Sequence, residues 1–359
     1  MPVSSPTPPV LAPLSAPTNH PLPSPASSDA PLCLFCAVDR RFALPLAVTL
    51  HSALAHAQTV SRMHIMVADM GLRRRQRAKL RSIVERSAVD VRLDFCVPDV
   101  DALQGLSTTD WHRLPTYVRL LVDQLVPESW TRLLYLDGDV LVRSDLGPLW
   151  RTPIGDAVAV GVRDYREPTV WQRHELREAY TDHLGLPPDT PYCNAGVLLI
   201  DLPRWRAHEI GPRSLDFLRR YPERAYYNDQ DALNAAIGGQ WMLADPRWNV
   251  TLNSVAFYGF PEMHTPAMRA AQQQLLREAR VVHYTGSHKP WHHLYRRPYS
   301  EPFMHSLRET RWFSPLRSWR WTTTRRVAHA VIQRVPDTVL MNAKSTVGTV
   351  RDRMKAVAS

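Results

Sequence analysis

The sequence predicts an α/β fold with a mostly parallel central sheet, and three observations lead to this prediction. Short apolar runs alternate with helical patterns from residue 32 to residue 136, and parallel strands need such crossover helices. The 359 residues are 44% hydrophobic and 22% charged, which supplies enough apolar material for a large core. Acidic residues directly follow the first and fourth apolar runs, at the strand ends where such sheets bind ligands.

The individual elements follow from local patterns. Bounded apolar runs predict strands at residues 32–38, 63–67, 89–97, 133–136, 157–162, 196–201 and 280–284. Apolar residues at helical spacing predict helices at residues 42–55, 72–87, 117–125, 205–221 and 229–237. Pro45 is compatible with the first of these helices because it falls in the first turn. The arginine run in the second favours a solvent-exposed helix face over a binding patch.

Composition divides the chain into three parts. Residues 1–30 are rich in Pro, Ser and Ala, which predicts a disordered leader because such a segment cannot bury enough surface to fold. Residues 31–300 form the single predicted domain, and residues 301–359 a basic, Trp- and Arg-rich helical tail. The N-terminus lacks the features of a secretory signal, and no run of apolar residues is long enough to span a membrane. With only four cysteines, these features predict a cytoplasmic protein.

The net charge of +10 is concentrated in the tail, since residues 306–359 hold eleven basic residues against three acids. Tryptophans beside arginines on an amphipathic stretch favour peripheral binding to an anionic membrane surface, such as the inner face of the membrane. The alternative is a helix packed on the domain with its arginines in solvent. A nucleic-acid partner is not expected, because the chain shows no nucleic-acid-binding fold signature.

The segment Asp137-Gly138-Asp139 is the most informative in the chain. It follows the buried strand at 133–136, and burying an unpaired carboxylate costs several kcal/mol or more. The two acids share one face of an extended chain, and Gly138 lets the backbone approach a ligand closely. This arrangement suits a hard divalent cation that in turn holds a phosphate. The alternative is a surface turn between two strands.

A second group of polar residues lies near residue 290. His283 ends the last predicted strand and could ligate a metal through one imidazole nitrogen, although such a histidine is more often a packed residue. Gly286 and Pro290 break regular structure and predict a loop. In that loop, Lys289 supplies a flexible positive charge that is suited to a phosphate.

Six segments in a characteristic order carry a family resemblance: Phe35-Cys36-Ala37-Val38-Asp39, Thr116-Tyr117-Val118-Arg119-Leu120, Leu134-Tyr135-Leu136-Asp137-Gly138-Asp139-Val140, Asn194-Ala195-Gly196-Val197-Leu198-Leu199-Ile200, Asn228-Asp229-Gln230-Asp231-Ala232-Leu233-Asn234, and His283-x-x-Gly286-x-x-Lys289-Pro290-Trp291. Together they resemble the family 8 glycosyltransferases, the retaining group that contains bacterial lipopolysaccharide galactosyl- and glucosyltransferases and glycogenin. The resemblance covers most of the chain between Leu32 and Trp291.

The resemblance implies a GT-A fold, a Rossmann-like domain that binds a UDP-sugar with a divalent metal. Manganese is the usual ion, and magnesium remains an alternative. The implied metal ligands are Asp137, Asp139 and His283. The implied contacts to the nucleotide and diphosphate are Ala37, Asp39, Arg119, Gly138, Gly286 and Lys289. The implied donor-sugar pocket contains Asp164, Asn194, Ala195, Asp229 and Gln230.

The expected reaction transfers galactose or glucose from UDP-galactose or UDP-glucose to a hydroxyl of lipopolysaccharide or another glycan. Gln230 matches the position of a nucleophile, but an amide is a poor one, so we expect front-face attack by the acceptor hydroxyl. Asp164 and Asp229 are expected to accept hydrogen bonds from sugar hydroxyls. The alternatives are a metal-dependent nucleotide hydrolase or nucleotidyltransferase, and a non-catalytic sugar-binding relative.

Overall fold

The computed structural model describes residues 30–106, 114–252, 266–286, 289–291 and 299–312. Its main sheet has seven strands in the order β3-β2-β1-β4-β7-β6-β8. These strands are β1 (Leu32–Asp39), β2 (Arg62–Met70), β3 (Asp90–Cys96), β4 (Arg132–Leu136), β6 (Ala159–Arg163), β7 (Cys193–Asp201) and β8 (Trp241–Leu243). Within this sheet only β7 runs against its neighbours, β4 and β6. The prediction of an α/β fold with a mostly parallel sheet is confirmed.

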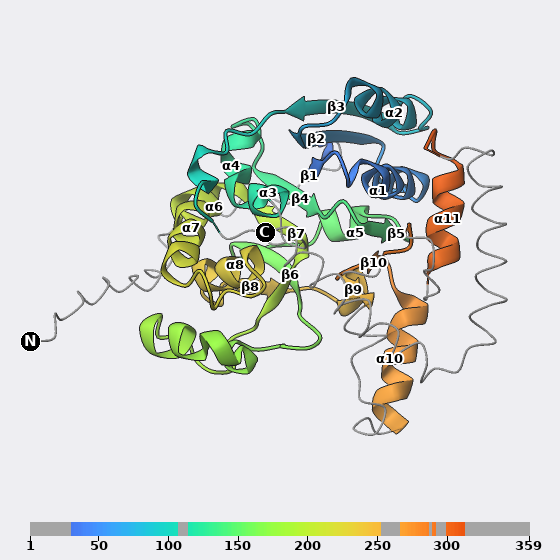
Figure 1. The fold of residues 1–359 in the computed structure, drawn as a ribbon. Coiled ribbons are helices and arrows are strands. Elements are labelled where there is room, and N and C mark those ends of the chain that lie inside the picture. The colour runs from blue at the N-terminus through green and yellow to red at the C-terminus, as the bar shows by residue number, and fades with distance from the viewer. Residues whose placement is uncertain (1–29, 107–113, 253–265, 287–288, 292–298, 313–359) are drawn as a thin grey trace, which may run out of the picture.

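Helices cover both faces of this sheet, with α1 and α2 on one side and α6, α7 and α8 on the other (Figure 1). The α-helices are α1 (Ala43–Ala55), α2 (Arg74–Val84), α3 (Leu114–Tyr117), α4 (Val122–Leu125), α5 (Gly147–Trp150), α6 (Leu202–Ala207), α7 (Ile210–Arg220), α8 (Asp229–Ile237), α10 (Pro266–Glu278) and α11 (Ser300–Arg308). The central strands β1, β4 and β7 are rich in apolar residues and buried on both faces, β7 along its entire length.

A second sheet places the distant strand β10 next to the acidic segment. Its strands are β5 (Val140–Val142), β10 (Val281–His283) and β9 (Val250–Thr251), in the order β5-β10-β9. β10 is antiparallel to β5, and their register pairs His283 with Val140. This pairing brings His283 within reach of the two acids that precede β5.

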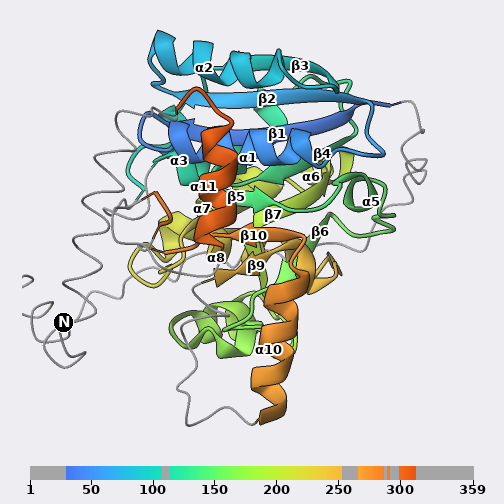
Figure 2. The same cartoon turned by 90° about the vertical axis from the view of Figure 1, so that its right-hand side faces the viewer.

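The helix α11 lies across α1 and the second sheet (Figure 2). Its Phe303, Met304 and Leu307 are buried in a cluster with Leu141 and Val282 of that sheet. The first residues of the segment expected to form a tail therefore pack on the domain. The rest of that segment, residues 313–359, lies outside the described residues, as do residues 1–29 of the predicted leader.

Two predicted helices are divided in the structure. The helix expected over 205–221 is α6 followed by α7, separated by Glu209 in a left-handed conformation with φ of 50°. At the start of α7, a Cβ atom on Gly211 would meet the carbonyl oxygen of Leu120, so glycine at this position lets α7 approach that segment closely. The helix expected over 117–125 is built from short helical turns, the 3₁₀ turn Val118–Leu121 followed by α4.

The four cysteines of the chain are free thiols. Cys33 and Cys36 are unpaired and buried in β1, and burial raises the pKa of the Cys33 thiol to about 12. They pack as apolar residues. No described helix is long and apolar enough to cross a bilayer.

Candidate functional site

The Asp137-Gly138-Asp139 segment connects the two sheets. The Asp137 amide donates to the Gly196 carbonyl over 2.9 Å, which extends the β4–β7 pairing by one residue. The Tyr284 amide donates to the Asp139 carbonyl over 3.1 Å, at the end of the second sheet. Each acid is thus fixed by a different sheet. The structure has room for a Cβ atom at Gly138, since it would lie 3.7 Å from the Leu46 Cβ, an ordinary contact distance.

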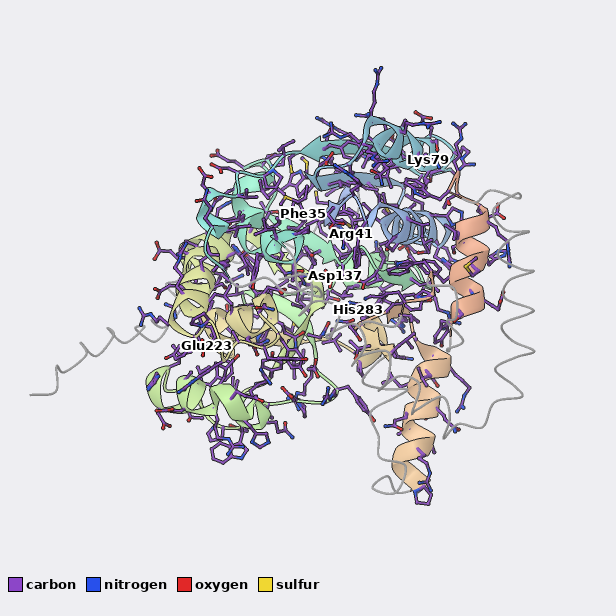
Figure 3. The ribbon with its side chains drawn as sticks, in the orientation of Figure 1. Phe35, Arg41, Lys79, Asp137, Glu223 and His283 are labelled. Carbon is purple, nitrogen blue, oxygen red and sulfur yellow. The ribbon has the colours of Figure 1, made fainter. Side chains whose placement is uncertain are left out.

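His283 lies between the two carboxylates, and Figure 3 shows Asp137 and His283 close together at the centre of the molecule. Its Nε2 is 3.4 Å from Asp137 Oδ2 and 3.4 Å from Asp139 Oδ1. One ligand atom from each of the three residues lies within 4.8 Å of the other two. Two ligands at right angles around one ion, each about 2.1 Å from it, lie roughly 3 Å apart. The three side chains therefore fit a shared cation with mixed oxygen and nitrogen ligands.

The other oxygens of the two carboxylates are held by protein groups. Asp137 Oδ1 accepts hydrogen bonds from Arg119 Nη2 at 2.6 Å and from the Tyr135 hydroxyl at 2.9 Å. Asp139 Oδ2 accepts one from Lys289 Nζ at 2.5 Å. These bonds turn one oxygen of each acid toward His283. Although burial raises the pKa of Asp139, the charge of Lys289 lowers it well below its usual value.

Arg119 is buried, and its guanidinium group binds several protein groups. Besides Asp137, it binds Asp229 Oδ2 at 2.9 Å and donates to the carbonyls of Ala195 and Thr116. Burial opposes its charge, but Asp137 and Asp229 raise the pKa of Arg119 above its ordinary value. Burial raises the pKa of Asp229 to about 7, against the charge of Arg119. Arg119 thus holds Asp137 in place, and its expected contact with the nucleotide stays a prediction.

The residues expected to form the donor-sugar pocket converge at the start of α8. Gln230 Oε1 accepts from Asn194 Nδ2 at 2.8 Å and from the Ala195 amide at 3.4 Å. Gln230 Nε2 donates to Asp164 Oδ2 over 3.3 Å. Four of the five expected pocket residues therefore belong to one hydrogen-bonded group, and Asp229 joins it through Arg119.

A strained residue positions the first turn of α8. Asn228 has φ of 47° and ψ of −109°, a conformation that is costly for any residue other than glycine. Its side-chain oxygen accepts a 2.7 Å hydrogen bond from the buried Tyr117 hydroxyl. Strain of this kind is concentrated at functional sites. Here the strained residue directly precedes Asp229 and Gln230, two residues of the expected donor-sugar pocket.

The residues expected to contact the nucleotide lie at neighbouring strand ends. β1 pairs with β4 through Phe35 and Tyr135, and Ala37 and Asp137 follow two residues later on each strand. Asp39 ends β1, and its Oδ1 accepts from the amide of Arg41 at 2.8 Å.

The predicted phosphate-binding loop is described in part, at residues 284–286 and 289–291. Gly286 has φ of +74°, which explains glycine at that position. Lys289 Nζ donates to the Tyr284 carbonyl and lies 5.8 Å and 5.7 Å from the ring centroids of Phe42 and Trp291.

Three residues of the site were not predicted from the sequence. Tyr135 binds Asp137, and Gly196 leaves room for the imidazole of His283. Asn249 Oδ1 lies 3.1 Å from His283 Nδ1. Asn249 follows a short 3₁₀ turn without any periodic pattern, so no sequence signal distinguishes it from an ordinary loop asparagine.

Comparison with known proteins connects this site to a family. The model of Glycosyl transferase family 8 matches residues 33–294. The chain belongs to this family. The lipopolysaccharide 1,2-glucosyltransferase of Escherichia coli K12 is 28% identical over 216 residues, which cover 60% of this chain and 59% of the relative. General stress protein A of Bacillus subtilis strain 168 is 26% identical over 281 residues, which cover 76% of this chain and 92% of that protein.

A solved structure supports the same assignment. The galactosyltransferase LgtC, in complex with donor and acceptor sugar analogues, superposes with a TM-score of 0.63 at 28% identity. The match covers 80% of this chain and 99% of LgtC. This member of family 8 is therefore a glycosyltransferase with a GT-A fold, as its sequence motifs predicted.

Proposed function

We propose that this glycosyltransferase transfers galactose or glucose from a UDP-sugar to a hydroxyl of lipopolysaccharide or another glycan, with retention of configuration. The cluster of Asp137, Asp139 and His283 beside Lys289 carries this proposal, because it suits a divalent cation and a diphosphate together. The relatives support the substrate class. One is named a lipopolysaccharide 1,2-glucosyltransferase, and another is the galactosyltransferase LgtC.

The donor set of the cluster favours manganese. Two carboxylate oxygens and one imidazole nitrogen form a mixed shell that suits Mn²⁺, whereas Mg²⁺ prefers oxygen ligands alone. Asp137, Asp139 and His283 would hold the ion. A bound ion would neutralise the charge that develops on the diphosphate as the bond to the sugar breaks.

The remaining steps use side chains of the chain itself. Lys289 can leave its contact with Asp139 to bind the departing diphosphate, whose negative charge grows during the reaction. The acceptor hydroxyl attacks the anomeric carbon from the face that UDP leaves, and its proton passes to the departing phosphate oxygen. Gln230, held by Asn194 and Asp164, orients its amide to stabilise the positive charge on the sugar.

The rival functions are less well supported. A nucleotide hydrolase or nucleotidyltransferase has no need of the amide and carboxylate group that Asn194, Gln230 and Asp164 form. A non-catalytic relative has no need to keep the metal cluster and Lys289 together.

The division into a leader at 1–30, a catalytic domain at 31–300 and a tail at 301–359 is part of the proposal. We also propose that the basic tail holds the enzyme at the inner, cytoplasmic face of a membrane, because anionic lipids attract such a charge. Sedimentation with anionic and neutral vesicles, before and after removal of residues 313–359, tests this. Equal binding of both proteins to anionic vesicles would contradict it.

A donor assay tests the proposed reaction. Release of UDP from UDP-galactose, UDP-glucose and other UDP-hexoses is measured with manganese and with EDTA, with and without a lipopolysaccharide acceptor. We expect release from one of the first two donors that requires the metal and increases with the acceptor. Absence of metal-dependent release from every UDP-hexose would contradict the proposal.

A further inference from the structure

A continuous chain of hydrogen bonds connects the metal cluster to the donor-sugar pocket. His283 Nδ1 lies 3.1 Å from Asn249 Oδ1, and Asn249 Nδ2 lies 2.8 Å from Asn194 Oδ1. The chain continues through Asn194 Nδ2 to Gln230 Oε1 at 2.8 Å, and through Gln230 Nε2 to Asp164 Oδ2 at 3.3 Å. All five residues are buried, so water does not readily substitute for these partners.

The chemistry of the groups determines which side donates and which accepts in each of these hydrogen bonds. An ionised carboxylate only accepts hydrogen bonds, so Asp164 requires the amide nitrogen of Gln230 on its side. The carbonyl of Gln230 then faces Asn194, and the amide of Ala195 also donates to it. The carbonyl of Asn194 is fixed again by the amide of Gly196, which donates to it over 3.0 Å. Two backbone amides thus support the same orientation of both side chains.

The same reasoning determines which nitrogen of His283 carries the proton. Because the carbonyl of Asn194 accepts, Asn249 must direct its amide nitrogen toward it and its carbonyl toward His283. A carbonyl is only an acceptor, so His283 Nδ1 must carry a proton. In the neutral imidazole the lone pair then lies on Nε2, the nitrogen that faces Asp137 and Asp139.

We propose that Asn249 is a positioning residue that fixes the tautomer of His283. Asp164 sets the orientation of the Asn249 side-chain amide through Gln230 and Asn194. The role in metal binding rests on the metal site proposed above. Partners in this position typically change metal affinity about 10- to 100-fold when they are removed. Through these hydrogen bonds, Asn194 and Asn249 connect the proposed metal site to the expected sugar pocket.

Metal affinity separates this role from a general effect on folding. Manganese binding is measured by calorimetry for the wild-type protein and for Asn249→Leu and Asn249→Asp. Leucine removes the acceptor for His283, and we expect affinity to fall about 10- to 100-fold. Aspartate keeps an acceptor for His283 Nδ1 but cannot donate to Asn194 Oδ1, and we expect the affinity to fall clearly less than in Asn249→Leu. Equal losses in both variants, or no loss in Asn249→Leu, would overturn the proposal.

Asn234→Leu is the matched control. Asn234 is also a buried asparagine, and it bonds to the backbone of Cys193 and Gln230 without touching His283. We expect this variant to lose stability and to keep a manganese affinity within about threefold of the wild type. A loss as large as that of Asn249→Leu would mean that loosening of the fold explains both, which would overturn the proposal.

A second measurement uses the wild-type protein without metal. Long-range proton–nitrogen NMR spectra, recorded under conditions in which the His283 signals themselves show a neutral ring, identify its protonated nitrogen, with His283→Ala to assign the signals. We expect the proton on Nδ1, and a proton on Nε2 would overturn the proposal. If the wild type bound no manganese, the proposed metal site would fail, and the NMR result would still decide the role of Asn249.

Discussion

Gly196 on β7 lies directly against the imidazole of His283 on β10. A Cβ atom at position 196 would overlap Cε1 of His283 and would lie 3.0 Å from Asp137 Oδ2. The main sheet and the second sheet can therefore approach closely at the proposed metal site only because residue 196 has no side chain.

We expect Gly196→Ala to damage the metal site. The added methyl group must displace the imidazole or the strand, and overpacking of this kind costs about 1–3 kcal/mol of stability. We expect manganese affinity, measured by calorimetry, to fall at least about tenfold. Gly138→Ala is the control, because its Cβ would lie at an ordinary 3.7 Å from Leu46 and should leave the affinity within about twofold. The same affinity in both variants would contradict the prediction.

We expect Lys289→Met to reduce the rate of sugar transfer. Removing one charge that stabilises a transition state costs about 100-fold or more in kcat. The variant also leaves Asp139 Oδ2 without its lysine partner. Steady-state kinetics with the preferred UDP-hexose measure the effect, and Lys289→Arg should keep part of the activity because it keeps the charge. A full kcat in Lys289→Met would refute this role.

We expect Arg173→Met to destabilise the fold beneath the sugar pocket. Arg173 holds the buried Asp231 with two bonds of 2.8 Å and 3.1 Å. Removing one partner of a buried ion pair costs about 3–5 kcal/mol, because it leaves a charge without compensation. Urea unfolding measures the loss. Arg224→Met is the control, since its ion pair with Glu178 is exposed, and it should cost less than about 1 kcal/mol.

We expect the buried Asp229 to make the stability of the metal-free protein depend on pH. Its pKa rises from 3.8 to about 7 in the folded state, because burial disfavours its charge. Below 3.8 the folded and unfolded chains both keep this proton, and the contribution of Asp229 to stability is complete. As the pH rises toward 7, the unfolded chain loses the proton first, so this contribution is lost.

The variant Asp229→Asn carries a side-chain amide that cannot ionise, so it should gain stability relative to the wild type as the pH rises. The relative gain is at most about 1.4 kcal/mol per pH unit. Urea unfolding of both proteins in EDTA at pH 5 and pH 8 measures it. A relative loss of stability on going to pH 8 would contradict the assignment of the raised pKa.

The sequence predicted the fold where local patterns are strong. The apolar runs located six of the seven strands of the main sheet to within a few residues and missed the short edge strand β8. The Asp-Gly-Asp segment supplies two members of the cluster that could hold a metal ion. The antiparallel direction of β7 was not predictable, because an apolar strand buried on both faces looks the same in either direction. The break at Glu209 was also missed, since the apolar pattern continues through it.

The supporting residues of the site depend on contacts between distant segments. Asn249 and Asn194 are 55 residues apart, and Arg119 and Ala195 are 76 apart, so no local pattern links them. Tyr135 alone carried a local signal, because a hydroxyl on the strand that leads to Asp137 has an acceptor two residues away.

Anomalous diffraction tests the central claim most directly. Crystals of the protein grown with manganese and UDP are measured at the manganese absorption edge. We predict one strong peak within bonding distance of Asp137, Asp139 and His283, with the diphosphate of UDP beside it and Lys289 on the diphosphate. A structure with UDP bound and no peak between these three side chains would contradict the account.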